Sequence, residues 1–264
     1  MLQDFTAEPL GGSKFDGVTG RSPQEVETST ALEEQLDYYR ARAAEYDQWW
    51  LRQGRYDRGP ALTAQWFAEA AEARAALLAF RPERRILELA CGTGIWTEQL
   101  LPFAAELTAV DGSREMLAIN SARIGSPRVR YLEADLFGWR PAAEDRYDTV
   151  FFGFWLSHVP PEWFTRFWDL VASCLAPEGR VFFVDSRYQE TSTAVDHVLP
   201  GRSAPVLQRR LNDGREFRVY KIFYHRDELT RRLADIGWSF EIEETTNYFM
   251  YGEGYHMTRE SGNG

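Results

Sequence analysis

The sequence has very little lysine and an excess of acidic residues. Only Lys14 and Lys221 are lysines, and the other basic side chains are mainly arginines. The net charge is −10 at pH 7, and the isoelectric point is near 5. Proteins that bind nucleic acid non-specifically need a cationic surface to displace counterions from phosphates. The charge therefore argues against a general polyanion binder, and we expect no nucleic-acid partner.

Cysteine is also scarce, and no long apolar run is present. Cys91 lies in a glycine motif and Cys174 in a predicted helix, so we expect no disulfide framework and a reducing compartment. No stretch of 18 apolar residues predicts a membrane span, and the first residues lack a signal-peptide pattern. We therefore expect a cytoplasmic protein without a membrane partner. The histidines are dispersed and show no metal-ligand spacing, so we expect no metal. They are His158, His197, His225 and His256.

Helix signals dominate the N-terminal third. Residues 1–29 are polar and aperiodic, which predicts a flexible acidic tail. Residues 30–33 match a capping box, which predicts a helix from Ala31 to about Leu51. Pro60 opens a second helix that extends to about Phe80.

One segment is more informative than any other. Residues 85–94, RILELACGTG, read as a buried strand followed by a glycine turn, and residues 95–103 have helical spacing. Asp111 ends the next apolar strand seventeen residues after Gly94, as in a nucleotide-binding βαβ unit. A dinucleotide fingerprint requires a small residue where Thr97 stands. The position of the acidic residue Glu88 inside the strand argues against NAD as the ligand and favours S-adenosylmethionine.

Acidic residues recur at the ends of successive strands. Asp111 follows a β-branched run, and Asp135 ends the next unit, residues 129–135. A carboxylate at a strand end can accept both hydroxyl protons of a ribose or a proton of an adenine amino group. Leu136 and Met116 would then be apolar walls. The alternative is that such an acid caps the following helix, and the sequence leaves this alternative open for Asp111.

With these motifs, the chain resembles the class I, Rossmann-like S-adenosylmethionine-dependent methyltransferases, in particular their small-molecule branch. The resemblance covers about residues 85–185 and rests on Glu-x-x-Cys-Gly-x-Gly, Val-Asp-x-Ser and Ala-Asp-Leu in that order. It implies S-adenosyl-L-methionine as the cofactor and S-adenosyl-L-homocysteine as its product. Glu88 and Gly92 would face the methionine portion. The complete set of expected cofactor residues is Tyr39, Tyr46, Glu88, Gly92, Asp111, Gly112, Met116, Asp135, Leu136 and Phe152.

The resemblance also implies a fold. We expect an α/β, doubly wound, mostly parallel seven-stranded sheet with helices on both faces and the last strand antiparallel. A helical lid at residues 30–81 would precede a methyltransferase domain at 82–264, with a substrate-side insertion at about 186–224. Asn212-Asp213-Gly214 would close a hairpin within that insertion.

Aromatic residues of the first helix have two interpretations. Tyr39, Tyr46, Trp49 and Trp50 lie at helical spacings. They can pack as an apolar stripe on the core. Alternatively, the tyrosines belong to a lid over the cofactor, as the resemblance implies.

The acceptor side is less determined by the sequence. His158 follows the fourth strand, so it is a candidate catalytic base, and the alternative is a structural role. Arg209 belongs to a run that attracts an anion or forms a solvated face. The expected substrate residues are Phe154, Trp155, Tyr188, His197 and Arg209.

Three functions remain open at this stage. The first is methyl transfer to a small molecule at an oxygen, nitrogen or carbon atom. The second is methylation of a macromolecule, either protein or RNA. The third is a cofactor-binding module without catalysis. The oligomeric state is not predicted.

Overall fold

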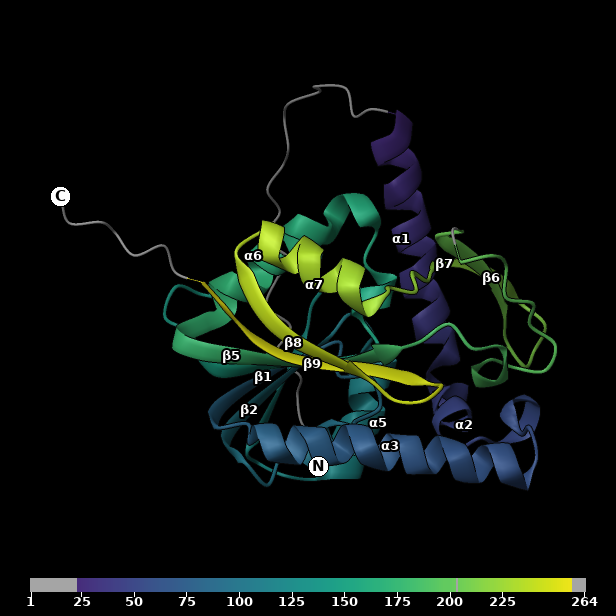
Figure 1. Ribbon diagram of the computed structural model, residues 1–264, viewed down its shortest axis with the longest axis horizontal. Coiled ribbons are helices and arrows are strands. Elements are labelled where there is room, and N and C mark those ends of the chain that lie inside the picture. The colour runs from purple at the N-terminus through teal and green to yellow at the C-terminus, as the bar shows by residue number, and fades with distance from the viewer. Residues whose placement is uncertain (1–22, 203, 258–264) are drawn as a thin grey trace.

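The fold centres on a seven-stranded sheet, which Figure 1 shows nearly edge-on in the computed structural model. The structure describes residues 23–202 and 204–257. The strand order is β3-β2-β1-β4-β5-β9-β8, and β9 runs antiparallel to both of its neighbours. The strands are β1 (Arg84–Leu89), β2 (Ala104–Asp111), β3 (Val129–Glu133), β4 (Tyr147–Gly153), β5 (Leu175–Ser186), β8 (Trp238–Glu244) and β9 (Phe249–His256). The expected sheet, with its last strand antiparallel, is confirmed.

Helices cover both faces of this sheet. The longest one, α3, runs along one face, while α6 and α7 lie on the opposite face (Figure 1). The helices are α1 (Pro23–Arg42), α2 (Tyr46–Trp50), α3 (Pro60–Phe80), α4 (Thr97–Leu100), α5 (Arg114–Ile124), α6 (Phe164–Cys174) and α7 (Arg226–Asp235). Short 3₁₀ turns occur at Ala43–Glu45, Gly54–Tyr56, Leu156–His158, Pro161–Trp163 and Glu190–Ser192.

Side chains alternate along the central strands, so each strand contributes to two apolar cores, one on each face of the sheet. Leu87 and Phe152 point to the face of α6 and α7, whereas Ile86 and Phe151 point to the face of α3. Because successive side chains of a strand face opposite sides, both faces of these parallel strands are apolar and buried. The carboxyl ends of the strands therefore form a rigid edge on which a site can be built.

A smaller unit stands beside this edge. The hairpin of β6 (Val206–Arg210) and β7 (Glu216–Tyr220) packs against α1 (Figure 1). Tyr38 of α1, Leu207 and Val219 form its own apolar cluster. The hairpin confirms the turn that Asn212-Asp213-Gly214 predicts.

Two helix predictions were wrong in their bounds. The first helix begins at Pro23, not Ala31, because proline is well suited to the first turn of a helix and no breaker follows it. This helix ends at Arg42, and a 3₁₀ turn separates it from α2. Residues 95–103 form only the four-residue α4. Residues 1–22 of the expected tail lie outside the described part of the chain.

Within the described residues, no helix is long and apolar enough to cross a membrane. The same part of the chain contains no group of three or more His, Cys, Asp or Glu side chains placed to hold a metal ion. Cys91 and Cys174 are both buried and unpaired.

Candidate active site

The site lies where the strand order reverses, between β1 and β4. Ligands of doubly wound sheets bind at this switch point, outside the carboxyl ends of the strands. Two non-glycine residues just beyond these strands, Ala90 and Phe154, have left-handed φ angles of 53° and 57°. Such backbone is strained for residues with a Cβ atom and concentrates at functional sites. Both residues line a cavity of about 260 Å³.

This first cavity gathers most of the expected cofactor residues. Of these, Tyr39, Tyr46, Gly92, Asp111, Gly112, Met116, Asp135 and Leu136 line it. They come from α1, α2, the glycine loop, the ends of β2 and β3, and the first turn of α5. The N-terminal helices and the sheet edge thus border the same space.

The backbone of the glycine loop, residues 91–94, borders this cavity at Gly92. Gly92 has φ +51°, and a Cβ atom there would meet nothing within 4 Å, so its open side is free for a ligand. Gly94 has φ +93°, and a Cβ atom there would lie 2.8 Å from Asn120. The first glycine therefore allows a close approach, while the second lets the loop pack on α5.

Asp111 is held by the loop it faces. Its Oδ2 accepts from the backbone N–H of Gly92 at 2.9 Å, and its Oδ1 accepts from that of Ser113 at 2.9 Å. Burial raises the pKa of Asp111 to about 6 despite these bonds. The N-cap of α5 is Ser113, whose hydroxyl accepts from Met116 N–H. Asp111 therefore does not cap α5, and each of its oxygens keeps a lone pair for a ligand.

The far end of the cavity is formed by residues 135–137. Asp135 is exposed, and its Oδ1 accepts from the N–H of Phe137 at 3.0 Å. Leu136 and Met116 are buried beside it. This end offers one carboxylate on an apolar wall, which suits a flat ring with an amino group.

Glu88 lies beneath the cavity rather than on its wall. It is 1% exposed, and its Oε2 accepts from the Thr97 hydroxyl at 2.6 Å. Asn120 donates to the same hydroxyl at 2.8 Å. Burial raises the pKa of Glu88 to about 8. The network explains why Thr97 stands where a dinucleotide fingerprint has a small residue: its hydroxyl joins the buried acid to α5.

Two other expected residues lie away from the cavities. Phe152 packs in the core on the face of α6 and α7, since its neighbours on β4 occupy the other face. Tyr188 packs edge-on against Phe223 and donates to the carbonyl of Pro200. The sequence indicated the right strand and insertion but not the side to which each ring points.

A second, smaller cavity of about 60 Å³ adjoins the first. Four residues line both cavities, and they are Tyr39, Tyr46, Phe154 and His158. The expected substrate residues His197 and Arg209 line the second cavity, and Trp155 lines the first. Sequence reasoning missed Arg42 and Lys221, which also line the second. Arg42 stands four residues from both Tyr38 and Tyr46 on the helical pattern, a signal that was available.

His158 is buried at the wall between the two cavities. Its Nδ1 lies 2.5 Å from the carbonyl oxygen of Tyr220, which can only accept, so Nδ1 carries the proton. Its Nε2 then accepts from the Tyr39 hydroxyl at 2.8 Å. Burial, together with the charge of Lys221, lowers the pKa of His158 well below 6.5. The imidazole is therefore neutral and has its free lone pair aimed at Tyr39.

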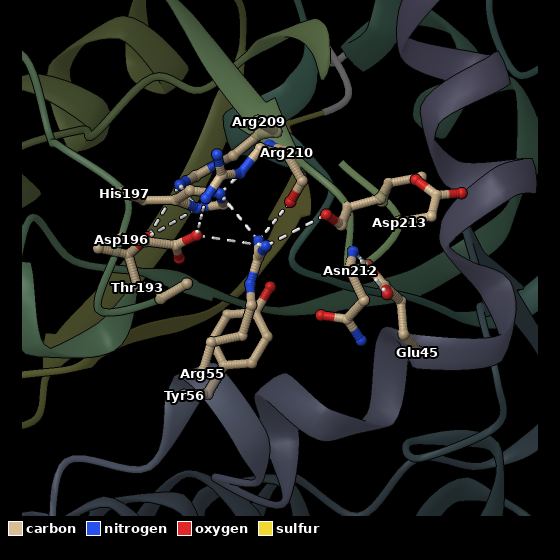
Figure 2. Close-up of polar contacts among 12 residues, drawn as sticks. Glu45, Arg55, Tyr56, Thr193, Asp196, His197, Arg209, Arg210, Asn212 and Asp213 are labelled. Atoms are coloured by element: carbon tan, nitrogen blue, oxygen red, sulfur yellow. Dashed lines mark hydrogen bonds and ion pairs between the residues drawn. The ribbon is translucent and has the colours of Figure 1, made fainter. Parts of the chain in front are cut away.

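Arg55 organises the outer side of the second cavity, as Figure 2 shows. Its guanidinium donates to the carbonyl oxygens of Arg210 and Leu211 and forms an ion pair with Asp196 at 3.6 Å. It also donates to Nε2 of His197 at 2.9 Å. Burial and the neighbouring charge of Arg209 lower the pKa of His197 to about 4. Arg55 thus ties the 196–197 loop to the hairpin.

A cavity at the switch point of a doubly wound sheet is typical of Rossmann-like cofactor-binding proteins. Comparison with known proteins identifies its family. Residues 86–179 match a methyltransferase domain model. The solved structure of a DhpI–SAH complex is 38% identical and covers 87% of this chain and 98% of its own, with a TM-score of 0.69.

Two further relatives are more distant. The ubiquinone biosynthesis O-methyltransferase of Proteus mirabilis is 31% identical over 106 residues, which are 38% of this chain and only 41% of that protein. The 1,6-didemethyltoxoflavin-N1-methyltransferase of Burkholderia thailandensis shares the fold at 17% identity, with a TM-score of 0.57 and coverage of 92% and 93%. The chain belongs to the class I S-adenosylmethionine-dependent methyltransferases, and its cofactor is S-adenosyl-L-methionine.

Proposed function

We propose that this methyltransferase acts on a small-molecule acceptor that enters the second cavity. The main support for this proposal is a wall that both cavities share. It is formed by Tyr39, Tyr46, Phe154 and His158. A donor in the first cavity and an acceptor in the second would meet there. The small volume of the second cavity and the net charge of −10 favour a small acceptor over protein or RNA. Two relatives, the ubiquinone biosynthesis O-methyltransferase and the 1,6-didemethyltoxoflavin-N1-methyltransferase, are named for small-molecule pathways or acceptors.

In this proposal the first cavity holds the cofactor by its polar groups. Asp111 accepts from the ribose hydroxyls, Asp135 with Leu136 takes the adenine, and Gly92 lies along the methionine portion. Glu88 acts on the methionine amino group from beneath, through water. These assignments suit the carboxylates that line the cavity, Glu33, Asp111 and Asp135, because the cofactor carries a sulfonium and an ammonium group.

When bound, the cofactor would supply a methyl group: its carbon–sulfur bond would break, with the electron pair left on sulfur, as the acceptor atom forms the new bond. The protein mainly aligns the reacting atoms, which accounts for a large part of such catalysis. Where the acceptor carries a proton, we propose that it passes to the Tyr39 oxygen while the hydroxyl proton of Tyr39 passes to Nε2 of His158. An anionic acceptor needs neither transfer.

The experiment is a label-transfer assay with methyl-labelled S-adenosylmethionine. Wild-type protein is incubated with a mixture of small metabolites, with total RNA, or with total protein. Label should enter the low-mass fraction, and Asp111→Ala should abolish it at low cofactor concentration. Label that appears only in RNA or protein would overturn the small-molecule proposal. Cofactor binding without any transfer would instead support a non-catalytic module.

A further inference from the structure

The two cavities carry opposite charge. Among the described residues, the first is lined by three carboxylates, Glu33, Asp111 and Asp135, and by no lysine or arginine. The second is lined by Arg42, Arg209 and Lys221, and no carboxylate from residues 23–202 or 204–257 lines it. The chain has ten more acidic than basic groups, so its overall composition does not account for three cations around one cavity.

The two arginines have no anionic partner in the described part of the chain. Arg42 is 9% exposed, its Nη2 donates to the Tyr56 hydroxyl at 3.3 Å, and its buried Nε has no partner. Its guanidinium lies over the rings of Tyr38 and Tyr46, 5.5 and 4.9 Å from their centroids. Cation–π contacts stabilise a buried guanidinium but provide no hydrogen-bond acceptor for its N–H groups.

Arg209 is similarly short of acceptors. Its Nη1 lies 2.9 Å from the Thr193 hydroxyl and 3.1 Å from Nδ1 of His197. The other ring nitrogen of His197 already accepts from Arg55 and from the backbone N–H of Arg210, so Nδ1 carries the proton of the neutral ring. Nδ1 therefore cannot accept, and the Thr193 hydroxyl is the acceptor that Arg209 keeps within the described part of the chain. Figure 2 shows Arg209 and His197 side by side, with Arg55 on the other side of the ring.

Lys221 differs from the arginines because its ammonium is fully bonded. It donates to Ser157 at 2.7 Å and to Ser186 at 3.2 Å, and it pairs with Asp185 at 3.4 Å. These bonds fix its position and compensate one charge. The second cavity is left with two uncompensated guanidinium groups.

We infer that the second cavity binds an oxyanion of the acceptor, held between Arg42 and Arg209 with Lys221 behind it. This inference rests on the proposed small-molecule function and names the chemistry of its substrate. Guanidinium groups bind phosphoryl-type and carboxyl oxyanions through paired N–H donors. Two uncompensated cations match a dianionic phosphoryl-type group better than a carboxylate. The volume of about 60 Å³ has room for such a group.

The test uses the full chain saturated with S-adenosylhomocysteine, which keeps probes out of the first cavity. Inorganic phosphate and, separately, acetate are titrated by calorimetry. Phosphate should bind, and acetate should bind more weakly. Arg42→Gln and Arg209→Gln should each weaken phosphate about ten- to a hundredfold, the effect of losing a charge-assisted bond. Their affinity for S-adenosylhomocysteine should remain that of the wild type.

Arg210→Gln is the matched control. Arg210 neighbours Arg209 on β6, but its side chain pairs with Asp196 at 2.8 Å and does not line the second cavity. Arg210→Gln should leave phosphate binding unchanged.

If Arg42→Gln does not fold, Arg209→Gln on the hairpin still decides the matter. The inference is overturned if the saturated wild type does not bind phosphate, or if Arg209→Gln binds it as Arg210→Gln does. Acetate binding tighter than phosphate would replace the phosphoryl-type group with a carboxylate. Failure of the proposed function is read separately, from the S-adenosylhomocysteine titration and the label-transfer assay.

Discussion

Glu88 makes the stability of the ligand-free protein depend on pH. Its pKa is raised by burial from 4.5 to about 8, so the folded state holds a proton that the unfolded chain loses above 4.5. The free energy of unfolding should therefore fall as the pH rises from 4.5 through about 8. Glu88→Gln should remove this loss, and each unit of raised pKa corresponds to about 1.4 kcal/mol at high pH. Denaturant unfolding at pH 5 and 8.5 measures the difference.

The control for this prediction is Glu98→Gln. Glu98 is an exposed residue of α4, next to Thr97. It should leave the pH dependence of the wild type intact. If Glu88→Gln and wild type lose stability in parallel between pH 5 and 8.5, the carboxyl of Glu88 is not buried as a neutral acid.

His158 and Tyr39 should act as one unit in turnover with a protonated acceptor. Removing either His158 by Ala or the Tyr39 hydroxyl by Phe should lower kcat about 10²–10⁴-fold, because the proton loses its path. Because the pKa of His158 lies well below 6.5, wild-type turnover should stay level from pH 8 to 6.5 and fall only in more acidic solution. The imidazole is neutral when folded, so stability should also fall below pH 6.5, where the unfolded chain gains the proton.

A structural role for His158 makes a different prediction. His158→Ala would then lower the melting temperature and leave turnover per folded molecule nearly intact. Kinetics and thermal unfolding on one preparation separate the two roles. The affinity for S-adenosylhomocysteine should change little in Tyr39→Phe, whose ring still covers the cavity.

At the scale of elements, the contacts of Asp47 with Thr93 and Arg123, called the clasp below, join the N-terminal helices to the glycine loop and α5. Asp47 of α2 accepts from the Thr93 hydroxyl at 2.6 Å and pairs with Arg123 of α5. Leu36 of α1 lies directly over Gly112. Removing residues 1–51 should therefore abolish cofactor retention, because the wall of the first cavity is lost.

Asp47→Ala tests the clasp without a truncation. It should weaken the binding of S-adenosylhomocysteine several-fold, since a partly exposed ion pair contributes about 0.2–1 kcal/mol and the Thr93 hydrogen bond adds to it. Asp37→Ala is the control, because it breaks an exposed ion pair within α1, that of Asp37 with Arg40. Equal affinity in the Asp47 and Asp37 variants would show that the clasp does not hold the lid.

The elements were predictable where local signals agree. Pro60 and Pro82 bound α3, glycine follows α7, and the β-branched run fixes β2. The start of α1 was misplaced because residues 30–33 imitate a cap, although nothing interrupts the helix before them. The length of α4 was overestimated because residues 95–103 have helical spacing, although Pro102 directly follows its C-cap residue and was an available stop signal.

At the scale of the whole molecule, cofactor binding should stabilise the fold. A ligand at a hundred times its Kd adds about 2.7 kcal/mol to the free energy of unfolding. For a chain of this size, S-adenosylhomocysteine should then raise the melting temperature by about 5–10 °C. NAD at the same concentration is the control and should have no effect, because the loop lacks the third small residue of a dinucleotide site. A shift with NAD alone would contradict the cofactor assignment.

The sheet side of the first cavity was predictable because its residues follow strand ends, which meet at one edge of a parallel sheet. The second was not. Arg42, Arg209 and Lys221 come from α1, the hairpin and the segment after it, and no local period links them. Only the packing of the hairpin on α1 brings their charges together.

The most direct test is the structure of the full chain with S-adenosylhomocysteine. The account predicts the ribose hydroxyls within hydrogen-bond distance of Asp111 and the adenine beside Asp135 and Leu136. The sulfur should face the wall of Tyr39 and His158, with the second cavity open on the side where a methyl group would point. An adenosyl group bound elsewhere, or a sulfur turned away from that wall, would contradict it.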